Sequence, residues 1–390
     1  MKQGSDAAVS YARLLVALLL FILSSLIFVA APTHSLWEIS IAVTERGYFL
    51  IPIALIAAFA SRQQSIISRL ATTIALLASA ILLVPLSQAA EIENGLAANL
   101  DRAFHAPPAI AAHRGGTLSL ASLLKPGQNG PGRVLYFPVT DSSSTRSDSL
   151  GVDFYPARGN LHAPLVVMIH GGSWQSGART DLPELNSYLA SLGYAVAAPS
   201  YRFAPAHPFP AALNDIRSAL AFLRAQSGDL GIDTTRIVIA GRSAGGQLAL
   251  LLAYTARDPT IRGAIGLYAP ADMVWGYNHP SDPRVLNSTE ALEAYLGGSP
   301  STAEPRYLDA SPFGFASATR VPTLLIHGTR DELVSVMQSR RLDRRLAHYA
   351  APHFLLELPW ATHGCDYFIT GPCGQLEAQA VARFLSIVTR

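Results

Sequence analysis

The first 90 residues contain three uncharged apolar stretches, which set them apart from the rest of the chain. Residues 14–37 and 70–90 carry no Asp, Glu, Lys or Arg, and each reaches the roughly 20 residues that a membrane-spanning helix needs. Residues 47–61 are also uncharged, but as a helix they cover about 22 Å of a hydrocarbon core about 30 Å thick. This stretch spans only if Arg46 and Arg62 snorkel to the membrane surfaces. We therefore predict an all-α transmembrane region at residues 1–90, with helices at about 14–34, 42–62 and 70–90.

A cleaved signal peptide is the alternative interpretation of the first stretch. Lys2 and Arg13 precede its apolar core, and residues 29–31 resemble a cleavage site. We disfavour cleavage because the core exceeds the usual length of about 7–15 residues and more apolar segments follow. With three spans, most of the flanking Lys and Arg residues lie on the side of the N-terminus. The positive-inside rule then predicts an integral cell-membrane protein with its C-terminal domain on the extracytoplasmic side.

The remainder of the chain divides into a connector and a large α/β domain. The connector at residues 91–132 begins with residues 91–95, for which continuation of the third helix is an alternative, and then becomes rich in Pro and Gly. This composition favours an irregular tether over a second domain. From residue 133 to residue 390, short apolar runs alternate with amphipathic ones, after an edge pair of strands separated by a Ser-rich turn at residues 141–144. This alternation predicts a mostly parallel sheet with helices on both faces.

The most informative motif is Gly-Arg-Ser-Ala-Gly at residues 241–245. The apolar run 236–240 predicts a buried strand that leads into it, and residues 246–253 predict a helix that starts at once. A serine on so sharp a turn takes strained backbone angles, and the flanking glycines remove side chains that would collide there. The turn lifts the hydroxyl above the sheet and points the positive end of the helix dipole at its target. Ser243 is therefore our candidate nucleophile.

Candidate partners for this serine occur in the order Ser, Asp, His along the chain. Asp331 follows the predicted strand 322–328, and His363 follows the last predicted strand, 353–358. A serine hydroxyl needs a base to take its proton, which is the role we expect for His363. The base needs a buried carboxylate on its other ring nitrogen. We favour Asp331 over its neighbour Glu332, since Asp331 comes first after the turn.

A second glycine-rich turn precedes the serine motif. The predicted strand 164–169 ends in His-Gly-Gly-Ser-Trp at residues 170–174. Backbone N–H groups of this turn, together with that of Ala244, could form an oxyanion hole; the alternative is that the turn merely ends a strand. His170 and His327 stand at strand ends and are expected to be packed or hydrogen-bonded rather than catalytic. No histidine has a metal-ligand spacing, so we expect neither a metal nor another cofactor.

Residues 133–390 resemble the α/β-hydrolase superfamily, in its hormone-sensitive-lipase-like and small carboxylesterase branch. The match rests on the segment 201–215, on the serine motif and on His-Gly-Thr-Arg-Asp at residues 327–331. The resemblance implies that the oxyanion donors are the N–H groups of Gly172, Ser173 and Ala244. Two features depart from the lipase-like pattern. Ser173-Trp174 replaces the usual third glycine, and Arg242 replaces an acidic residue.

The resemblance implies a serine hydrolase, with a carboxylesterase for small acyl esters as the leading interpretation, and the apolar N-terminal helices predict that it is anchored in the membrane. His-Gly-Gly-x-Trp is also similar to feruloyl esterases, isoprenylcysteine methylesterases and kynurenine formamidases, which keeps a formamidase or amidase as the alternative. A peptidase of the prolyl-oligopeptidase type is weaker, because the first 130 or so residues leave no room for a propeller. A non-catalytic interaction protein on the same fold is disfavoured because every triad position is filled.

Aromatic residues and cysteines add two further expectations. The irregular segment 272–317 commonly covers the substrate pocket in this fold, so Trp174, Trp275 and Tyr277 are candidate pocket residues; packing under the loop is the alternative. Cys365 and Cys373 are the only two cysteines. In an oxidising compartment they can close a disulfide beside His363, the alternative being two separate buried thiols.

Composition and net charge indicate which classes of partner the protein binds. Half of the residues are hydrophobic, 14% are charged and the mean hydropathy is +0.27, with the excess in the first 90 residues. The net charge is only +2, with no basic run and no phosphate-binding loop, so we expect no nucleic-acid partner. A small-molecule ester and the lipid bilayer are the expected partners, and the oligomeric state is not encoded in any pattern of the sequence.

Overall fold

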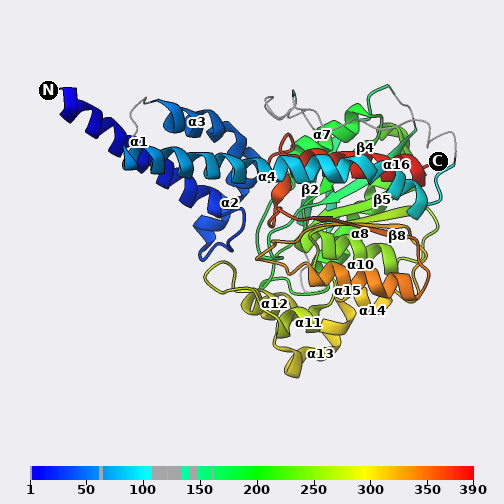
Figure 1. Cartoon of the computed structure of the whole chain (residues 1–390). Helices are drawn as coiled ribbons and strands as arrows, with labels where there is room; N and C mark the ends of the chain where they lie inside the picture. Colours follow the sequence, from blue (N-terminus) through cyan, green and yellow to red (C-terminus); the bar gives the residue numbers. More distant parts are fainter. Residues whose placement is uncertain (1, 61–64, 108–120, 122–132, 140–147, 160–161) are drawn as a thin grey trace.

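A computed structural model describes residues 2–60, 65–107, 121, 133–139, 148–159 and 162–390. Its N-terminal helices project from one side of a larger domain (Figure 1). Their bounds are α1 Lys2–Ser25, α2 His34–Arg46, α3 Ile51–Phe59 and α4 Ile66–Ala103, with the short 3₁₀ helix η1, Gly47–Leu50, between α2 and α3.

The large domain is built on an eight-stranded, mostly parallel sheet, as predicted. The strands lie in the order β1-β2-β4-β3-β5-β6-β7-β8; β2 runs antiparallel to β1 and β4, and the remaining pairs are parallel. Their bounds are β1 Arg133–Val139, β2 Asp148–Tyr155, β3 Ala163–Ile169, β4 Ala195–Pro199, β5 Ile232–Arg242, β6 Ile261–Leu267, β7 Thr323–Gly328 and β8 His353–Leu358. In the register of β3 and β5, Ile169 lies opposite Gly241. The two glycine-rich turns therefore emerge side by side at the same edge of the sheet. The predicted Ser-rich turn lies outside the described residues.

Helices cover both faces of this sheet (Figure 1). The helices around the sheet are α7 Pro183–Ser191, α8 Ala211–Ala225, α9 Ser227–Leu230, α10 Ala244–Thr255, α15 Met337–His348 and α16 Pro372–Val388. Between β6 and β7 lie the short helices α11 Met273–Asn278, α12 Ser288–Leu296, α13 Pro300–Asp309 and α14 Pro312–Phe315, and η2 Cys365–Tyr367 follows β8.

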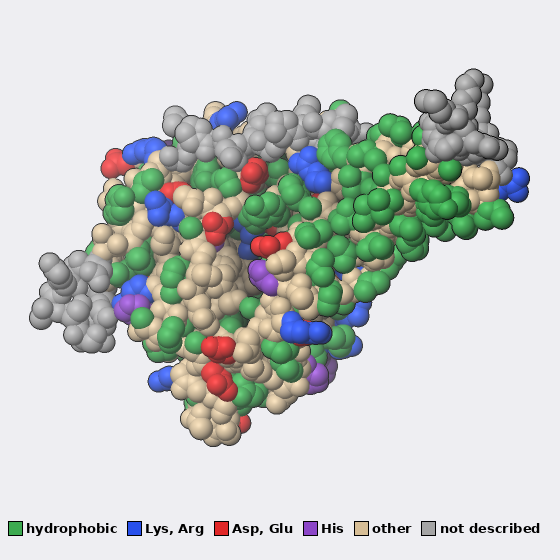
Figure 2. Space-filling model, turned by 90° about the vertical axis from the view of Figure 1, so that its left-hand side faces the viewer, with side chains coloured by type: hydrophobic (Ala, Val, Ile, Leu, Met, Phe, Trp, Pro, Cys, Tyr) green, Lys and Arg blue, Asp and Glu red, His purple; other side chains and the backbone are tan. Residues whose placement is uncertain are grey.

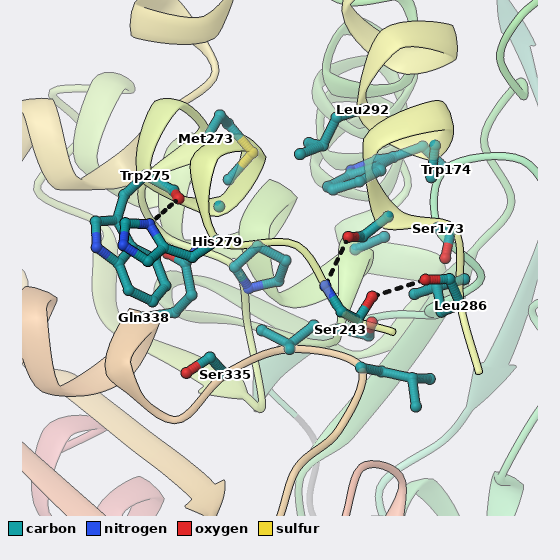
Figure 3. A pocket seen from close by; sticks show the side chains of 18 residues that line it. Ser173, Trp174, Ser243, Met273, Trp275, His279, Leu286, Leu292, Ser335 and Gln338 are labelled. Atoms are coloured by element: carbon teal, nitrogen blue, oxygen red, sulfur yellow. Dashed lines mark hydrogen bonds between the residues drawn. The ribbon is translucent and has the colours of Figure 1, made fainter. Parts of the chain in front are cut away.

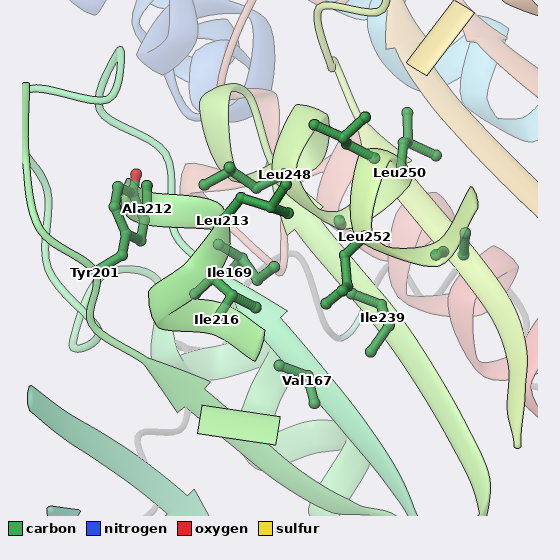
Figure 4. Close-up of a cluster of buried hydrophobic side chains, with 14 of the residues drawn as sticks. Val167, Ile169, Tyr201, Ala212, Leu213, Ile216, Ile239, Leu248, Leu250 and Leu252 are labelled. Atoms are coloured by element: carbon green, nitrogen blue, oxygen red, sulfur yellow. The ribbon is translucent and has the colours of Figure 1, made fainter. Parts of the chain in front are cut away.

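The period of two along each central strand divides the core into two layers. On β3, Val167 and Ile169 face the layer that contains α8 and α10, whereas Val166 and Met168 face α7 and α16. Figure 4 shows the first layer, where Ile216 of α8 packs over the strands beside α10. Such uniformly apolar strands fit a parallel sheet that is buried on both faces.

Helix α4 extends further than its composition suggests. We predicted a helix ending near residue 90 followed by an irregular tether at 91–132, but α4 continues to Ala103. Its C-terminal half packs on the large domain, where Leu96 and Leu100 are buried against α16. Asp101 also accepts two hydrogen bonds, of 2.6 and 2.7 Å, from Arg383 of α16. The rest of the predicted tether lies mostly outside the described residues.

The N-terminal helices form an apolar bundle whose surface differs from that of the large domain. Three helical segments are long and apolar enough to cross a membrane: Ala7–Ser25, His34–Phe59 and Ile66–Ala103. Figure 2 shows hydrophobic side chains gathered over this projection, whereas charged side chains are scattered over the large domain. We predicted one helix at about 42–62. The structure instead has two short helices, α2 and α3, with η1 between them after Arg46.

Arg13 of α1 joins this helix to α3 and α4 within the bundle. It is buried, and its guanidinium donates to the backbone oxygens of Ala57 and Ala58 at the end of α3, at 2.8 and 2.5 Å. It also donates to the hydroxyl of Ser68 on α4, at 2.6 Å. The last carbonyls of a helix have no partner within the helix, and in an apolar environment each unsatisfied group costs several kcal/mol. Arg13 therefore caps the short α3 from within the bundle.

Candidate active site

The serine motif forms a strand-to-helix elbow between β5 and α10. Ser243 has φ +50° and ψ −120°, a strained conformation for a residue other than glycine. A Cβ on Gly245 would lie 2.3 Å from the carbonyl oxygens of Ile169 and His170. Only glycine therefore lets the elbow approach the end of β3 so closely, and the hydroxyl is raised at the edge of the sheet.

Ser243, His363 and Asp331 are brought together from three loops. The Nε2 atom of His363 lies 3.0 Å from the Ser243 hydroxyl, and its Nδ1 lies 2.6 Å from Asp331 Oδ2. Burial alone would raise the pKa of Asp331, but the charge of His363 and the hydrogen bonds from His327 and His363 lower it to about 2. A carboxylate that stays ionised fixes the proton on Nδ1, so that Nε2 is free to accept the serine proton.

Asp331 is held in place by groups that the sequence did not identify. Its Oδ1 accepts hydrogen bonds from the backbone N–H groups of Leu333 and Val334, at 2.9 and 2.8 Å. The Nε2 atom of His327 lies 3.1 Å from Oδ2 and 2.8 Å from the Val334 oxygen, so it carries a proton. Its Nδ1 then accepts from the Ser339 hydroxyl, at 2.7 Å. His327 is thus hydrogen-bonded, as expected for a strand-end residue, but it also positions the acid.

Glu332, the competing acid, faces another part of the molecule. Its Oε1 accepts a 2.7 Å hydrogen bond from the backbone N–H of Ala31. The carboxylate that contacts His363 belongs to Asp331.

The turn after β3 has the backbone shape of an anion-binding site. Gly172 has φ +114°, and a Cβ there would lie 2.1 Å from the Ser176 oxygen. Ser173 also has a positive φ, +52°. Among the described residues, the N–H groups of Gly172, Ser173 and Ala244 donate no hydrogen bond within the protein. Backbone N–H groups without a partner in the protein can donate to an anion.

Two aromatic rings support this turn: His170, which we expected to be packed or hydrogen-bonded, and Tyr201, which was not singled out. The ring of His170 stacks on that of Tyr201, with centroids 4.3 Å apart. The Tyr201 hydroxyl donates to the backbone oxygens of His170 and Gly171, at 3.1 and 3.2 Å. Burial lowers the pKa of His170, so its ring is neutral and acts as packing.

Arg242 ties the elbow to the loop that carries His363. It is buried, and its Nε donates to Asp366 Oδ2 at 2.5 Å. Asp366 Oδ1 in turn accepts from the Tyr268 hydroxyl, at 2.6 Å, and the Tyr268 ring packs edge-on against His363, with centroids 4.6 Å apart. Arg242 stands where the lipase-like pattern has an acidic residue. Its charge is paired with that of Asp366 on the histidine loop.

A pocket opens beside Ser243, with a volume of about 60 Å³. Trp174 forms one wall, stacked on Tyr295 and hydrogen-bonded to Gln247. Trp275 stacks on His279 on another (Figure 3). The other apolar lining residues include Met273, Leu286, Leu292, Leu333 and Val334.

Tyr277 does not line this pocket, contrary to our expectation. Its hydroxyl donates to Glu293 at 2.6 Å, and its ring packs edge-on against Tyr307. Tyr277 therefore joins α11 to α12 and α13. Spacing alone did not distinguish it from Trp275, which lies two residues away on the same short helix.

Cys365 and Cys373 form a disulfide directly after His363. Replacing both with alanine is expected to lower the free energy of unfolding by about 2–3 kcal/mol, because the short loop between them gains conformational freedom in the unfolded chain. Thermal unfolding of the detergent-solubilised double variant and of the wild-type protein checks this. An unchanged unfolding temperature would contradict the expected contribution.

Comparisons with known proteins agree on the class of this site. The BD-FAE family model matches residues 152–346, which is half of the chain. Esterase LipC of Mycobacterium tuberculosis is 32% identical over 246 residues, covering 58% of this chain and 59% of LipC. The probable carboxylic ester hydrolase LipM of the same organism is 32% identical over 240 residues, covering 58% of this chain and 54% of LipM. The chain thus spans between half and two thirds of these relatives.

Solved structures show the fold. An esterase from the archaeon Pyrobaculum calidifontis superposes with a TM-score of 0.56 at 20% identity, covering 78% of this chain and 98% of that chain. A bacterial heroin esterase superposes with a TM-score of 0.55 at 22% identity, with the same coverage of both chains. The large domain has the α/β-hydrolase fold.

Proposed function

The chain belongs to the BD-FAE family, and on that premise we propose that it is a membrane-anchored serine carboxylesterase for small acyl esters. The observation that carries the proposal is the unbroken chain of hydrogen bonds from Asp331 through His363 to the Ser243 hydroxyl. Curated relatives that carry the names of esterases support the same reaction class.

In the proposed acylation step, His363 Nε2 takes the proton of Ser243 as the hydroxyl oxygen attacks the ester carbonyl. The oxyanion forms within reach of the N–H groups of Gly172, Ser173 and Ala244, whose dipoles are already fixed by the two turns. The protonated His363 then gives its proton to the alkoxide oxygen, and the alcohol leaves.

In the proposed deacylation step, water replaces the alcohol. His363 takes a proton from this water, which attacks the acyl-serine carbonyl, and the same N–H groups hold the second oxyanion. The proton then returns to Ser243 as the carboxylic acid leaves. The small pocket beside Ser243 favours short acyl groups.

The N-terminal helices supply the proposed membrane anchor. Segments 7–25 and 66–103 are long enough to span, and Arg13 caps the shorter α3 between them. Three crossings place the N-terminus and the large domain on opposite sides, with the large domain outside the cytoplasm by the positive-inside rule. The disulfide between Cys365 and Cys373 fits an oxidising compartment.

Sidedness is tested by labelling single introduced cysteines with a membrane-impermeant maleimide on intact cells. Since both native cysteines are in the disulfide, Ser301→Cys in the large domain is expected to react and Ser5→Cys near the N-terminus only after cell lysis. The reverse pattern would place the large domain in the cytoplasm.

Activity is tested on the full chain in detergent, because α4 packs on the large domain. The substrates are p-nitrophenyl esters from acetate to palmitate and N-formylkynurenine, each with a Ser243→Ala control. Serine-dependent turnover that is highest on short acyl chains is the expected result. Preference for the formamide would support a formamidase instead, and no turnover by a folded chain would support a non-catalytic role.

A further inference from the structure

The segment between α1 and α2 docks on the loops that carry the proposed acid and base. Ala31 N–H donates to Glu332 at 2.7 Å, and Arg330 Nε donates to the Ile27 oxygen at 3.0 Å, on either side of Asp331. The N–H of His34 donates to the Arg284 oxygen at 3.1 Å. The N-terminal region therefore forms part of the surroundings of the active site.

Helix α2 lies against the histidine loop. The buried carboxylate of Glu45 accepts hydrogen bonds from the Trp360 indole at 3.1 Å and from the Cys373 N–H at 2.8 Å. Arg46 donates to the Thr370 hydroxyl at 2.6 Å. These contacts fix α2 on both sides of His363.

Trp37 of α2 faces the proposed base. Its ring centroid lies 6.5 Å from that of His363. The indole N–H is buried and has no hydrogen-bond partner in the part of the chain that the structure describes. Burying a polar N–H without a partner costs roughly 1–3 kcal/mol, which a substrate acceptor would recover. Trp37 therefore lies beside the group that must protonate the departing alcohol oxygen.

A second, larger cavity adjoins the acyl pocket and is walled by this N-terminal segment. Its volume is about 400 Å³, against about 60 Å³ for the acyl pocket. The two cavities share His279, Ser281, Leu333 and Ser335. Residues 30–32 form one wall of the larger cavity, and its other lining residues include the polar Asp282, Arg284 and Glu332. The polar glycerol backbone of a lipid suits such a lining better than a fatty acyl chain does.

The larger cavity also lies at the membrane end of the bundle. Segment 7–25, which is long enough to span, ends shortly before the cavity wall at residues 30–32. Phe28 and Val29 lie between them and are 49% and 57% exposed. In the proposed anchor, this wall therefore lies where the chain leaves the hydrocarbon core, at the level of the lipid headgroups.

We propose that the α1–α2 segment forms the alcohol-side subsite, with Trp37 as a specificity-determining residue, and that the substrate is a short-chain acyl ester on the headgroup of a membrane lipid. The inference rests on the proposed esterase function and membrane anchor. The short acyl group occupies the pocket beside Ser243. The lipid alcohol occupies the larger cavity, with its tails in the bilayer.

The test uses the full chain reconstituted in dioleoylphosphatidylcholine vesicles that contain dioleoyl acetyl glycerol, with ethyl acetate as a soluble reference ester. We expect Ser243-dependent release of acetate from the vesicles. Trp37→Ala is expected to lower the ratio of kcat/KM on the lipid acetate to kcat/KM on ethyl acetate by about tenfold. Trp37→Phe, which keeps the ring and loses the N–H, is expected to give an intermediate ratio. Tyr136→Ala, an exposed aromatic on the edge strand β1, is the matched control and should leave the ratio unchanged.

Each other outcome overturns the proposal. Equal losses on both esters would make Trp37 only a structural support for His363. Release of oleate instead of acetate would reverse the assignment of the two cavities. Turnover of ethyl acetate without release from vesicles would overturn the lipid substrate and leave the esterase proposal standing, whereas no turnover of either ester would overturn both. If Trp37→Ala does not fold, Ala30→Trp provides the second variant, since a large side chain on the cavity wall should lower the same ratio.

Discussion

Replacing Ser243 with alanine is expected to reduce ester turnover by at least about 10³-fold, because the residual activity of a triad enzyme without its nucleophile comes from binding and oxyanion stabilisation alone. The hydroxyl is the atom that His363 contacts, at 3.0 Å. Steady-state kinetics on p-nitrophenyl acetate measures the loss. The backbone strain at Ser243 is set by the elbow glycines, so the variant should unfold within a few degrees of the wild-type protein.

A matched serine replacement separates this effect from a general loss of structure. Ser386 of α16 donates its hydroxyl to the Arg383 oxygen, at 2.7 Å, remote from the elbow. Ser386→Ala should therefore retain wild-type turnover. Near-wild-type activity in Ser243→Ala would contradict the assignment of the nucleophile.

Asp331→Asn is expected to lower kcat by about 10⁴-fold, the size seen when a triad acid is replaced by its amide. Asp331 Oδ1 accepts from the N–H groups of Leu333 and Val334, so the amide oxygen must take that position. The NH₂ group then faces His363 Nδ1 and forces the proton onto Nε2, where it can no longer accept the serine proton. Asp343→Asn is the matched control, since Asp343 pairs with His353 at 3.4 Å outside the site. A loss below tenfold would contradict this role.

The effect of Asp331→Asn on stability is also expected to depend on pH. Because the pKa of Asp331 is lowered to about 2 in the folded protein, its ionised form stabilises the fold fully above the unfolded pKa of about 4. That stabilisation is lost as the pH falls from about 4 towards 2. The difference in unfolding temperature between the wild-type protein and Asp331→Asn should therefore shrink over this range. A difference that grows with acid would contradict the lowered pKa.

Local patterns were sufficient for the sheet and for the elbow. Apolar runs predicted most of the strands, and the glycines around Ser243 predicted its strained backbone angles, because both depend on neighbours in the sequence. The strands β4 and β6 were not singled out, since their short apolar runs lack a motif at their ends.

Helix α4 shows a boundary that composition misplaced. Glu91 and Glu93 resemble the end of a membrane helix. However, Ala89, Leu96, Leu100 and nearby Phe104 are buried at helical spacing against the large domain. The helical spacing of apolar residues therefore continues beyond Glu91 and Glu93. It predicts the end of α4 better than the first charged residues do.

The contacts of α2 could not be predicted from neighbouring residues. Glu45 and Trp360 are 315 positions apart, and no periodicity relates Trp37 to His363. One indirect signal was present. A glutamate at the edge of an apolar segment needs a partner when it is buried, and Glu45 finds its partners on the histidine loop.

The most direct test of the central claim is to trap the acyl-enzyme. The full chain is mixed with p-nitrophenyl acetate, quenched in acid during the initial burst, digested and mapped by mass spectrometry. Acetylation of the peptide that contains Ser243, absent in Ser243→Ala, is the predicted result. Turnover with the acetyl group on another residue, or with no acetylated peptide, would contradict the proposed mechanism.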